Sequence, residues 1–263
     1  MSRDVLLIHG MYMNAKSWSP WITFGAERGF HCKAISWPFH EGEPDQLRSH
    51  QDPALGHLKF GAIVDFYKKH IDTLKTRPLL IGHSIGGLIV QKLVNDGYAS
   101  AAVAISSAPP QGIISMDPVF FRSNFPHINP LALNQPIEMT AKRFHYTFCN
   151  TIGRNESDRA FNEYVVPESR NVPRSTLTKQ ARIDFKKAHV PLLLLSGDCD
   201  HLIPLKLARK NFAAYRHNAG DVEFREFSSR SHFICNEPGW EEVAATAFTW
   251  LDFQAQHGQE RGI

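Results

Sequence analysis

A buried strand that runs through a glycine-rich turn into a helix is the strongest constraint in this sequence. The apolar residues 79–81 are typical of a buried strand, and residues 85–95 are typical of a helix that ends at Gly97. Between them lies Gly82-His83-Ser84-Ile85-Gly86. A turn this tight forces its serine into a strained backbone conformation, so the flanking positions must lack bulk. The sequence therefore predicts that Ser84 lies at the amino end of a helix, where N–H groups favour developing negative charge.

Three other stretches provide the groups that such a serine needs. Apolar residues 192–195 lead into the turn Ser196-Gly197-Asp198-Cys199-Asp200, which places acids at the edge where open α/β sheets hold their sites. Ser231-His232-Phe233 follows a strand-like run at 222–227. Near the amino end, residues 5–8 lead into His9-Gly10-Met11-Tyr12, where a backbone N–H could face the serine.

The order and spacing of these four stretches resemble the α/β-hydrolase family across nearly the whole chain. The resemblance implies that Ser84 is a nucleophile, His232 its base and Asp200 the acid that orients the base. It also implies oxyanion-binding N–H groups at Met11 and Ile85. Asp198 is the alternative acid, although the family's acid usually falls three residues after a glycine, as Asp200 does after Gly197.

The expected fold is α/β, with a shortened, mainly parallel sheet of about six strands flanked by helices. Residues 1–110 and 188–263 should form this core, and residues 37–53 a polar loop within it. The remaining segment, 111–187, is rich in phenylalanine and lacks a convincing buried strand, which resembles the helical cap of the family. We expect strands and helices of the core at the following positions: strands 5–9, 31–36, 79–81, 101–106, 192–195 and 222–227; helices 14–28, 57–76, 85–95, 205–215 and 241–256.

Aromatic side chains are the candidates for an apolar substrate pocket. Phe144 and Phe148 come from the expected cap, and Tyr12 and Phe233 flank the expected catalytic groups in sequence. About two or three of the phenylalanines of the expected cap should contact a ligand, and the others should pack between cap and core.

Composition excludes several other classes of function. The net charge is +3, from 29 basic and 26 acidic residues, which gives no support for a nucleic-acid or membrane partner. The sequence contains no apolar run near the roughly 18–20 residues of a membrane span, and no signal-peptide pattern at its start. It also lacks a metal-ligand motif and a dinucleotide-binding glycine motif. We therefore expect no metal, no cofactor, a cytoplasmic location, a small-molecule substrate, and a monomer or homodimer.

The resemblance implies hydrolysis of a carboxylic ester or lactone through an acyl-enzyme on Ser84. Two alternatives stay open. The fold could serve as a non-hydrolytic ligand-binding receptor, or the chain could be a lyase similar to plant hydroxynitrile lyases. Those lyases carry a threonine in the first oxyanion turn and a lysine directly after the catalytic histidine, whereas Gly10 and Phe233 occupy these positions here.

Overall fold

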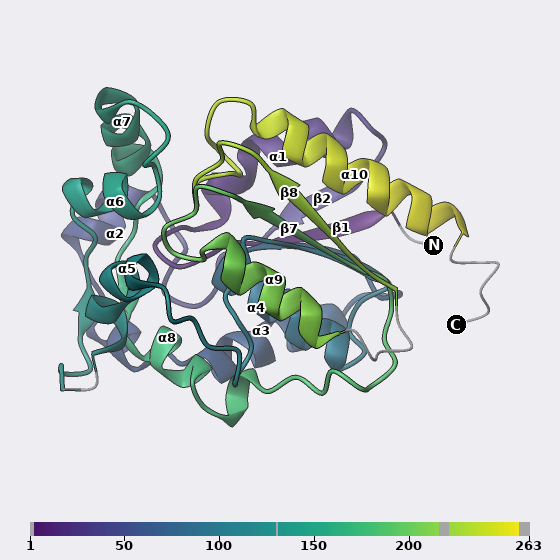
Figure 1. Ribbon diagram of the computed structural model, residues 1–263, viewed down its shortest axis with the longest axis horizontal. Helices are drawn as coiled ribbons and strands as arrows, with labels where there is room; N and C mark the ends of the chain where they lie inside the picture. Colours follow the sequence, from purple (N-terminus) through teal and green to yellow (C-terminus); the bar gives the residue numbers. More distant parts are fainter. Residues whose placement is uncertain (1–2, 130, 216–220, 258–263) are drawn as a thin grey trace.

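A six-stranded parallel sheet forms the centre of the molecule. The computed structural model describes residues 3–129, 131–215 and 221–257. The strand order is β2-β1-β3-β4-β7-β8, and every neighbouring pair is parallel (Figure 1). This arrangement confirms the predicted α/β fold with a shortened, mainly parallel sheet. The strands, in chain order, are β1 (Asp4–Ile8), β2 (His31–Ala34), β3 (Leu79–His83), β4 (Ala101–Ile105), β7 (Leu192–Gly197) and β8 (Val222–Phe227).

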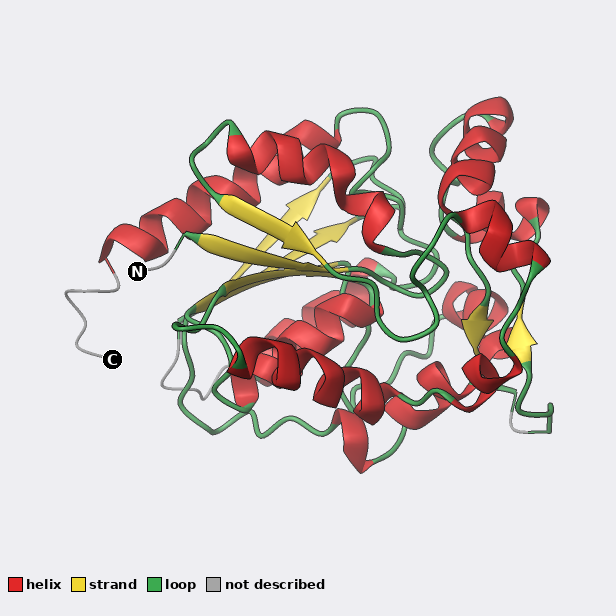
Figure 2. Cartoon of the chain, turned by 180° about the vertical axis from the view of Figure 1, so that it is seen from behind, coloured by secondary structure: helices red, strands yellow, loops and turns green. Residues whose placement is uncertain are grey.

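Helices cover both faces of this sheet, as Figures 1 and 2 show from opposite sides. One face carries α1 (Ser19–Ala26) and α10 (Trp240–His257), and the other carries α3 (Phe60–Asp72), α4 (Ile85–Asn95) and α9 (Leu205–Ala214). Successive side chains of a strand point to opposite faces, so the sheet separates two apolar cores.

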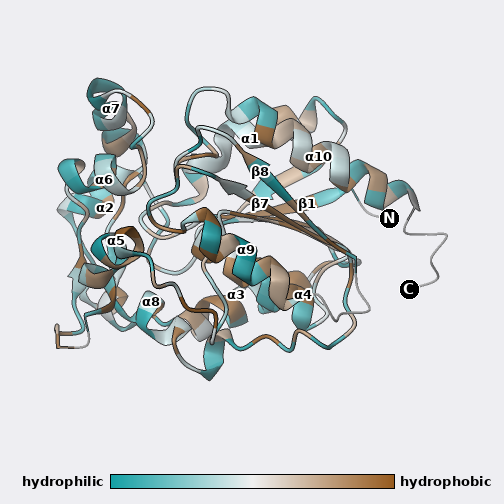
Figure 3. Ribbon diagram, in the orientation of Figure 1, coloured by the Kyte–Doolittle hydropathy of each residue, from teal (hydrophilic) through white to brown (hydrophobic). Residues whose placement is uncertain are grey.

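The strand β1 illustrates this division. Its Leu6 and Ile8 belong to the core on the α3 and α4 side, while Val5 and Leu7 pack in the core that contains Trp21 and Phe248. Figure 3 shows brown, hydrophobic central strands, whereas the edge strand β8 is largely teal. Among the described residues, no helix has the length and apolar character required to cross a lipid bilayer.

One expected helix, 14–28, is divided in the structure, and another, 57–76, is shorter than expected. A 3-10 turn, Ala15–Trp18, precedes α1, and a second 3-10 turn, Pro53–His57, precedes α3. The expected polar loop 37–53 contains a helix, α2 (Pro44–Ser49), so its assignment as loop alone was wrong. Proline is favourable in the first turn of a helix, because the N–H that it lacks would have no intrahelical partner there.

Residues 111–187, called the inserted segment below, connect β4 to β7, and their helices lie beyond the carboxyl ends of the strands (Figure 1). Its helices are α5 (Pro118–Ile128), α6 (Ala141–Thr147), α7 (Arg154–Tyr164) and α8 (Asn171–Thr176), followed by a 3-10 turn, Lys179–Ala181. Two short strands that the sequence did not suggest, β5 (Pro136–Ile137) and β6 (Glu168–Ser169), pair antiparallel within it.

Candidate active site

Ser84 lies in the sharp turn between β3 and α4. Its backbone has φ +56° and ψ −119°, a conformation that is strained for a residue with a side chain. The turn requires glycine at positions 82 and 86, because there is no space for a side chain at either position. A Cβ atom at position 86 would lie 2.2 Å from the carbonyl oxygen of Ile8, and one at position 82 would lie 2.3 Å from that of Gly86. The expected strand–turn–helix geometry is therefore present.

Ser84, His232 and Asp200 form one hydrogen-bonded row. His232 Nε2 lies 2.9 Å from Ser84 Oγ, and His232 Nδ1 lies 2.6 Å from Asp200 Oδ2. All three side chains are buried. An ionised carboxylate only accepts hydrogen bonds, so Nδ1 carries a proton and Nε2 is free to accept the proton of the serine hydroxyl.

Asp200 and Asp198 have different partners, which bears on the choice between them. Asp200 Oδ1 accepts from the backbone N–H groups of Leu202 and Ile203, both at 2.8 Å, so its carboxylate is held in a fixed orientation. Asp198 is exposed and accepts from the backbone N–H of Ser229 at 2.7 Å. The structure thus brings Asp200 to the histidine and assigns Asp198 to a contact between two loops.

His83 holds the backbone of His232 in place. Its Nε2 donates to the backbone carbonyl of His232 at 2.8 Å, and the two rings lie 4.7 Å apart. Burial, together with the neighbouring His232, lowers the pKa of His83 well below its ordinary value, so His83 stays neutral. Phe148 also contacts the ring of His232, with ring centroids 5.0 Å apart.

The two expected oxyanion donors lie beside the serine. Met11 follows β1, Ile85 is the first residue of α4, and both line the same cavity as Ser84. Neither backbone N–H donates a hydrogen bond to another described residue. A Cβ at Gly10 would lie 2.9 Å from Ser84 Cβ, so the close approach of this turn to the serine requires glycine.

Tyr12 joins this turn to the inserted segment. Its backbone N–H donates to Glu168 Oε2 at 3.4 Å, its carbonyl accepts from Val166 N–H at 3.0 Å, and its hydroxyl lies 2.6 Å from His127 Nδ1. Glu168 is fully buried and also contacts His40 Nε2 at 3.2 Å. Sequence reasoning did not find Glu168, because nothing in its local sequence indicates that its carboxylate faces the core.

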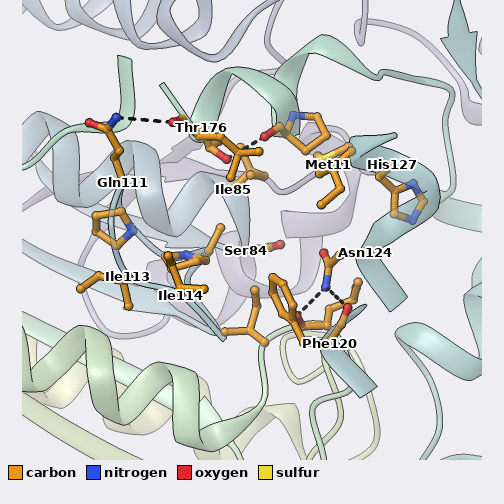
Figure 4. A pocket seen from close by; sticks show the side chains of 18 of the residues that line it. Met11, Ser84, Ile85, Gln111, Ile113, Ile114, Phe120, Asn124, His127 and Thr176 are labelled. Carbon is orange, nitrogen blue, oxygen red and sulfur yellow. Dashed lines mark hydrogen bonds between the residues drawn. The ribbon is translucent and has the colours of Figure 1, made fainter. Parts of the chain in front are cut away.

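A cavity of about 410 Å³ opens onto Ser84 (Figure 4). Its wall is mostly apolar and draws on the turns after β1, β3, β4 and β7 and on α5 and α8 of the inserted segment. Of the four expected pocket residues, Tyr12 and Phe148 line it. Other residues of the wall include Phe120, Asn124, His127, Thr176 and Leu202.

The expectation that Phe144 and Phe233 line this cavity was wrong. Phe144 stacks on Phe148 at a centroid distance of 5.0 Å, and Phe233 packs against the edge of Phe144 at 5.7 Å. Both are buried behind the ring of Phe148, which takes the position facing the cavity. Two phenylalanines of the inserted segment, Phe120 and Phe148, line the wall.

Helix α5 contributes two polar residues to the cavity that sequence reasoning missed. Asn124 and His127 line the wall together with Phe120, whereas the other two phenylalanines of the helix, Phe121 and Phe125, are exposed. Aromatic side chains were the predicted pocket residues, yet this helix turns two of its aromatic side chains outward. A helical start is visible at Asp117-Pro118, and the spacing of three places Asn124 and His127 on one face, but the sequence does not show which face is inward.

The arrangement has the groups that acyl transfer requires: a hydroxyl hydrogen-bonded to an imidazole, a carboxylate that fixes the tautomer of that imidazole, and two nearby backbone N–H groups that donate to no described residue. The described residues include no cluster of His, Cys, Asp or Glu side chains suited to a metal ion.

Comparison with known proteins gives a family and a fold. The family described as "Alpha/beta hydrolase family" matches residues 5–246. No curated protein is significantly similar in sequence. A monoacylglycerol lipase from Paleococcus ferrophilus has a similar structure, with a TM-score of 0.69, 22% identity, and coverage of 95% of this chain and 94% of the lipase.

Two further solved structures are comparable. A tomato methylketone synthase I variant complexed with beta-ketoheptanoate has a TM-score of 0.70 and 14% identity, and the match covers 97% of this chain and 99% of the other. A pyrethroid hydrolase from Sphingobium faniae has a TM-score of 0.67 and 14% identity, and covers 98% and 100%. At these identities the likeness concerns the fold.

Proposed function

The chain belongs to the alpha/beta hydrolase family, and from this premise we propose that it is a serine hydrolase that cleaves a carboxylic ester or lactone through an acyl-enzyme. One observation carries the proposal: the hydrogen-bonded row of Ser84, His232 and Asp200 opens onto an apolar cavity. In this reading the inserted segment acts as the cap that roofs the site and selects the substrate.

In the first half-reaction, Ser84 Oγ attacks the carbonyl carbon of the ester while its proton passes to His232 Nε2. The carbonyl oxygen becomes an oxyanion that the N–H groups of Met11 and Ile85 stabilise, each worth about 3 kcal/mol by analogy with measured donors. Collapse of this intermediate breaks the carbon–oxygen bond, and the leaving alcohol takes the proton from His232.

In the second half-reaction, water attacks the acyl-enzyme and gives one proton to His232. Collapse of the second tetrahedral intermediate releases the carboxylic acid and returns the proton to Ser84 Oγ. Asp200 holds the Nδ1–H tautomer of His232 throughout and stabilises the imidazolium that forms twice in each cycle.

The test is a panel of short-chain esters and lactones assayed with the wild type and with Ser84→Ala in parallel. We expect Ser84→Ala to lose activity by a factor on the order of 10⁴ or more, with the fold unchanged by circular dichroism. A fluorophosphonate should label Ser84 in the wild type. Wild-type inactivity across the panel would favour the alternative of a non-hydrolytic ligand-binding protein. Retained activity in Ser84→Ala, or labelling of another serine, would exclude this mechanism.

A further inference from the structure

The amide of Asn124 has a fixed orientation in the cavity wall. Its Nδ2 donates to the backbone carbonyls of Phe120 and Leu202, both at 3.0 Å. Carbonyl oxygens only accept hydrogen bonds, so the NH₂ group must face them and the two ends of the amide cannot exchange. The oxygen Oδ1 consequently faces the opposite way, and Figure 4 shows it directed toward Ser84. None of the described residues donates a hydrogen bond to this oxygen.

His127 provides a second unpaired polar atom, three residues further along α5. Its Nδ1 lies 2.6 Å from the Tyr12 hydroxyl, and no other described residue offers that hydroxyl an acceptor. Donation by that hydroxyl places the imidazole proton on Nε2, which is buried without a partner in the described part of the chain. Burial lowers the pKa of His127 to about 3, so the ring is neutral and Nε2–H is its remaining donor.

A buried donor such as His127 Nε2 costs free energy without a partner unless a ligand pairs with it, and Asn124 Oδ1 is an open acceptor on the same cavity wall. Residues three apart on a helix have Cβ atoms about 5–6 Å apart, so one small group can contact both. A hydroxyl both donates and accepts and therefore matches the pair, whereas an amide N–H could satisfy Asn124 alone.

We propose that Asn124 and His127 form a subsite for a free hydroxyl group of the substrate, which donates to Asn124 Oδ1 and accepts from His127 Nε2. This inference rests on the proposed ester hydrolysis and narrows its substrates to hydroxy esters: partial esters of polyols, or esters of hydroxy acids. The rest of the cavity wall is mostly apolar and suits the hydrocarbon part of such a molecule.

The test uses two pairs of esters in which a methyl group replaces the hydroxyl. One pair is 2-hydroxyethyl butanoate with propyl butanoate, and the other is ethyl 3-hydroxybutanoate with ethyl 3-methylbutanoate. For each pair, kcat/KM is measured on one enzyme preparation, so the ratio does not depend on the folded fraction. We expect the wild type to prefer the hydroxy ester of at least one pair, and Asn124→Leu to lower that ratio about tenfold or more.

Two further variants sharpen this test. His127→Phe removes the donor and should lower the same ratio. Thr176→Val is the matched control, because Thr176 lines the same cavity but its hydroxyl already donates to the carbonyl of Pro173 at 2.8 Å. It should change both esters of a pair alike.

The possible failures are distinguishable. If Ser84-dependent hydrolysis of the esters occurs but both ratios stay the same in Asn124→Leu and His127→Phe, the hydroxyl subsite is wrong and the proposed function stands. If the wild type hydrolyses neither these four esters nor any ester or lactone of the panel above, or if Ser84→Ala is equally active, the proposed function fails and the subsite falls with it.

Discussion

The backbone N–H of Tyr12 donates to the carboxylate of Glu168, so a buried side chain of the inserted segment holds the turn after β1. Val166 holds the same residue from its other side, through the Tyr12 carbonyl. Tyr12 has φ +63°, a left-handed conformation that a non-glycine residue adopts at a cost. The N–H of its neighbour Met11 is a proposed oxyanion donor. The geometry of that donor therefore depends on contacts made by the inserted segment.

Glu168→Gln is expected to lower kcat by roughly 10- to 100-fold with KM within about threefold, because a misplaced oxyanion donor weakens transition-state binding. The new amide can donate to His40 Nε2, since His40 Nδ1 lies 3.1 Å from the Pro38 carbonyl and carries a proton. Its NH₂ group then opposes the Tyr12 N–H. An alkyl boronic acid that forms a tetrahedral adduct with Ser84 should bind more weakly by a similar factor.

Ser169→Ala is the matched control for this variant. Ser169 is buried next to Glu168, and its hydroxyl donates to the carbonyl of Leu58 at 2.8 Å without a contact to Tyr12. It should lower the melting temperature and leave kcat nearly unchanged. Equal losses of kcat in both variants would show that Glu168 acts through general stability rather than through the oxyanion turn.

Asp200→Asn and Asp198→Asn should differ strongly in activity. In Asp200→Asn the side chain can present an NH₂ group to His232 Nδ1, which favours the wrong tautomer, so we expect a loss in kcat on the order of 10³- to 10⁴-fold. In Asp198→Asn the amide oxygen can still accept from the Ser229 N–H, so that variant should stay within about threefold of the wild type. Steady-state kinetics on one ester settles the comparison, and similar losses would contradict the assignment of Asp200.

Shortening Phe148 and shortening Phe144 should have different effects. Phe148 lines the cavity, so Phe148→Ala should raise KM or shift the preferred acyl length, by about ten- to two-hundredfold at most. Phe144 is fully buried behind it, so Phe144→Ala should lower the free energy of unfolding by about 3–5 kcal/mol and leave the ranking of substrates unchanged. Acyl-length profiles and urea unfolding measure the two effects, and a reversed pattern would contradict the cavity wall described here.

The free energy of unfolding should decrease as the pH falls below about 6.5, which is the pKa of histidine in an unfolded chain. Burial lowers the pKa of His127 to about 3, and it lowers those of His9 and His83 well below their ordinary value. Between the folded and unfolded pKa values the unfolded chain binds protons that the folded chain does not. Each such histidine therefore reduces the free energy of unfolding by at most about 1.4 kcal/mol per pH unit.

His127→Gln tests this pH dependence. Urea unfolding between pH 7 and pH 4 should give a shallower fall in stability for the variant than for the wild type. Titrating carboxylates affect both proteins alike and cancel in the difference. Equal slopes would mean that His127 takes up a proton in the folded state.

The sequence predicted the core well, because its signals are local and strong. The apolar run before Ser84 and the glycines around it define a strand, a turn and a helix within about 17 residues. Parallel strands place their carboxyl ends at one edge, so Asp200 and His232 could be expected near Ser84 once β7 and β8 were recognised.

The inserted segment was predictable only in outline, since its side-chain directions depend on tertiary packing. Phe144 and Phe148 are equivalent in the sequence, since both are phenylalanines of the same segment. In the structure Phe148 faces the cavity and Phe144 lies behind it. A glutamate such as Glu168 is expected on the surface from the sequence alone, but its side chain is fully buried in the structure. The cavity side of α5 carries Phe120, Asn124 and His127 while Phe121 and Phe125 face outward, and no local pattern encodes which face is which.

The hydrogen bond from Gln111 N–H to the carbonyl of Ala181, at 3.0 Å, has a consequence for engineering. The chain leaves the core and returns to it at this one point, so residues 112–180 form a loop whose ends are neighbours. The return path to β7 starts only after Ala181, where Lys187 Nζ donates to the carbonyl of Asn95 at 2.6 Å. A short turn joining 111 to 181 would thus remove most of the inserted segment and keep the crossover between β4 and β7. A segment exchanged at this junction would have to supply new partners for the N–H and the carbonyl of Tyr12, which Glu168 and Val166 hold in this chain.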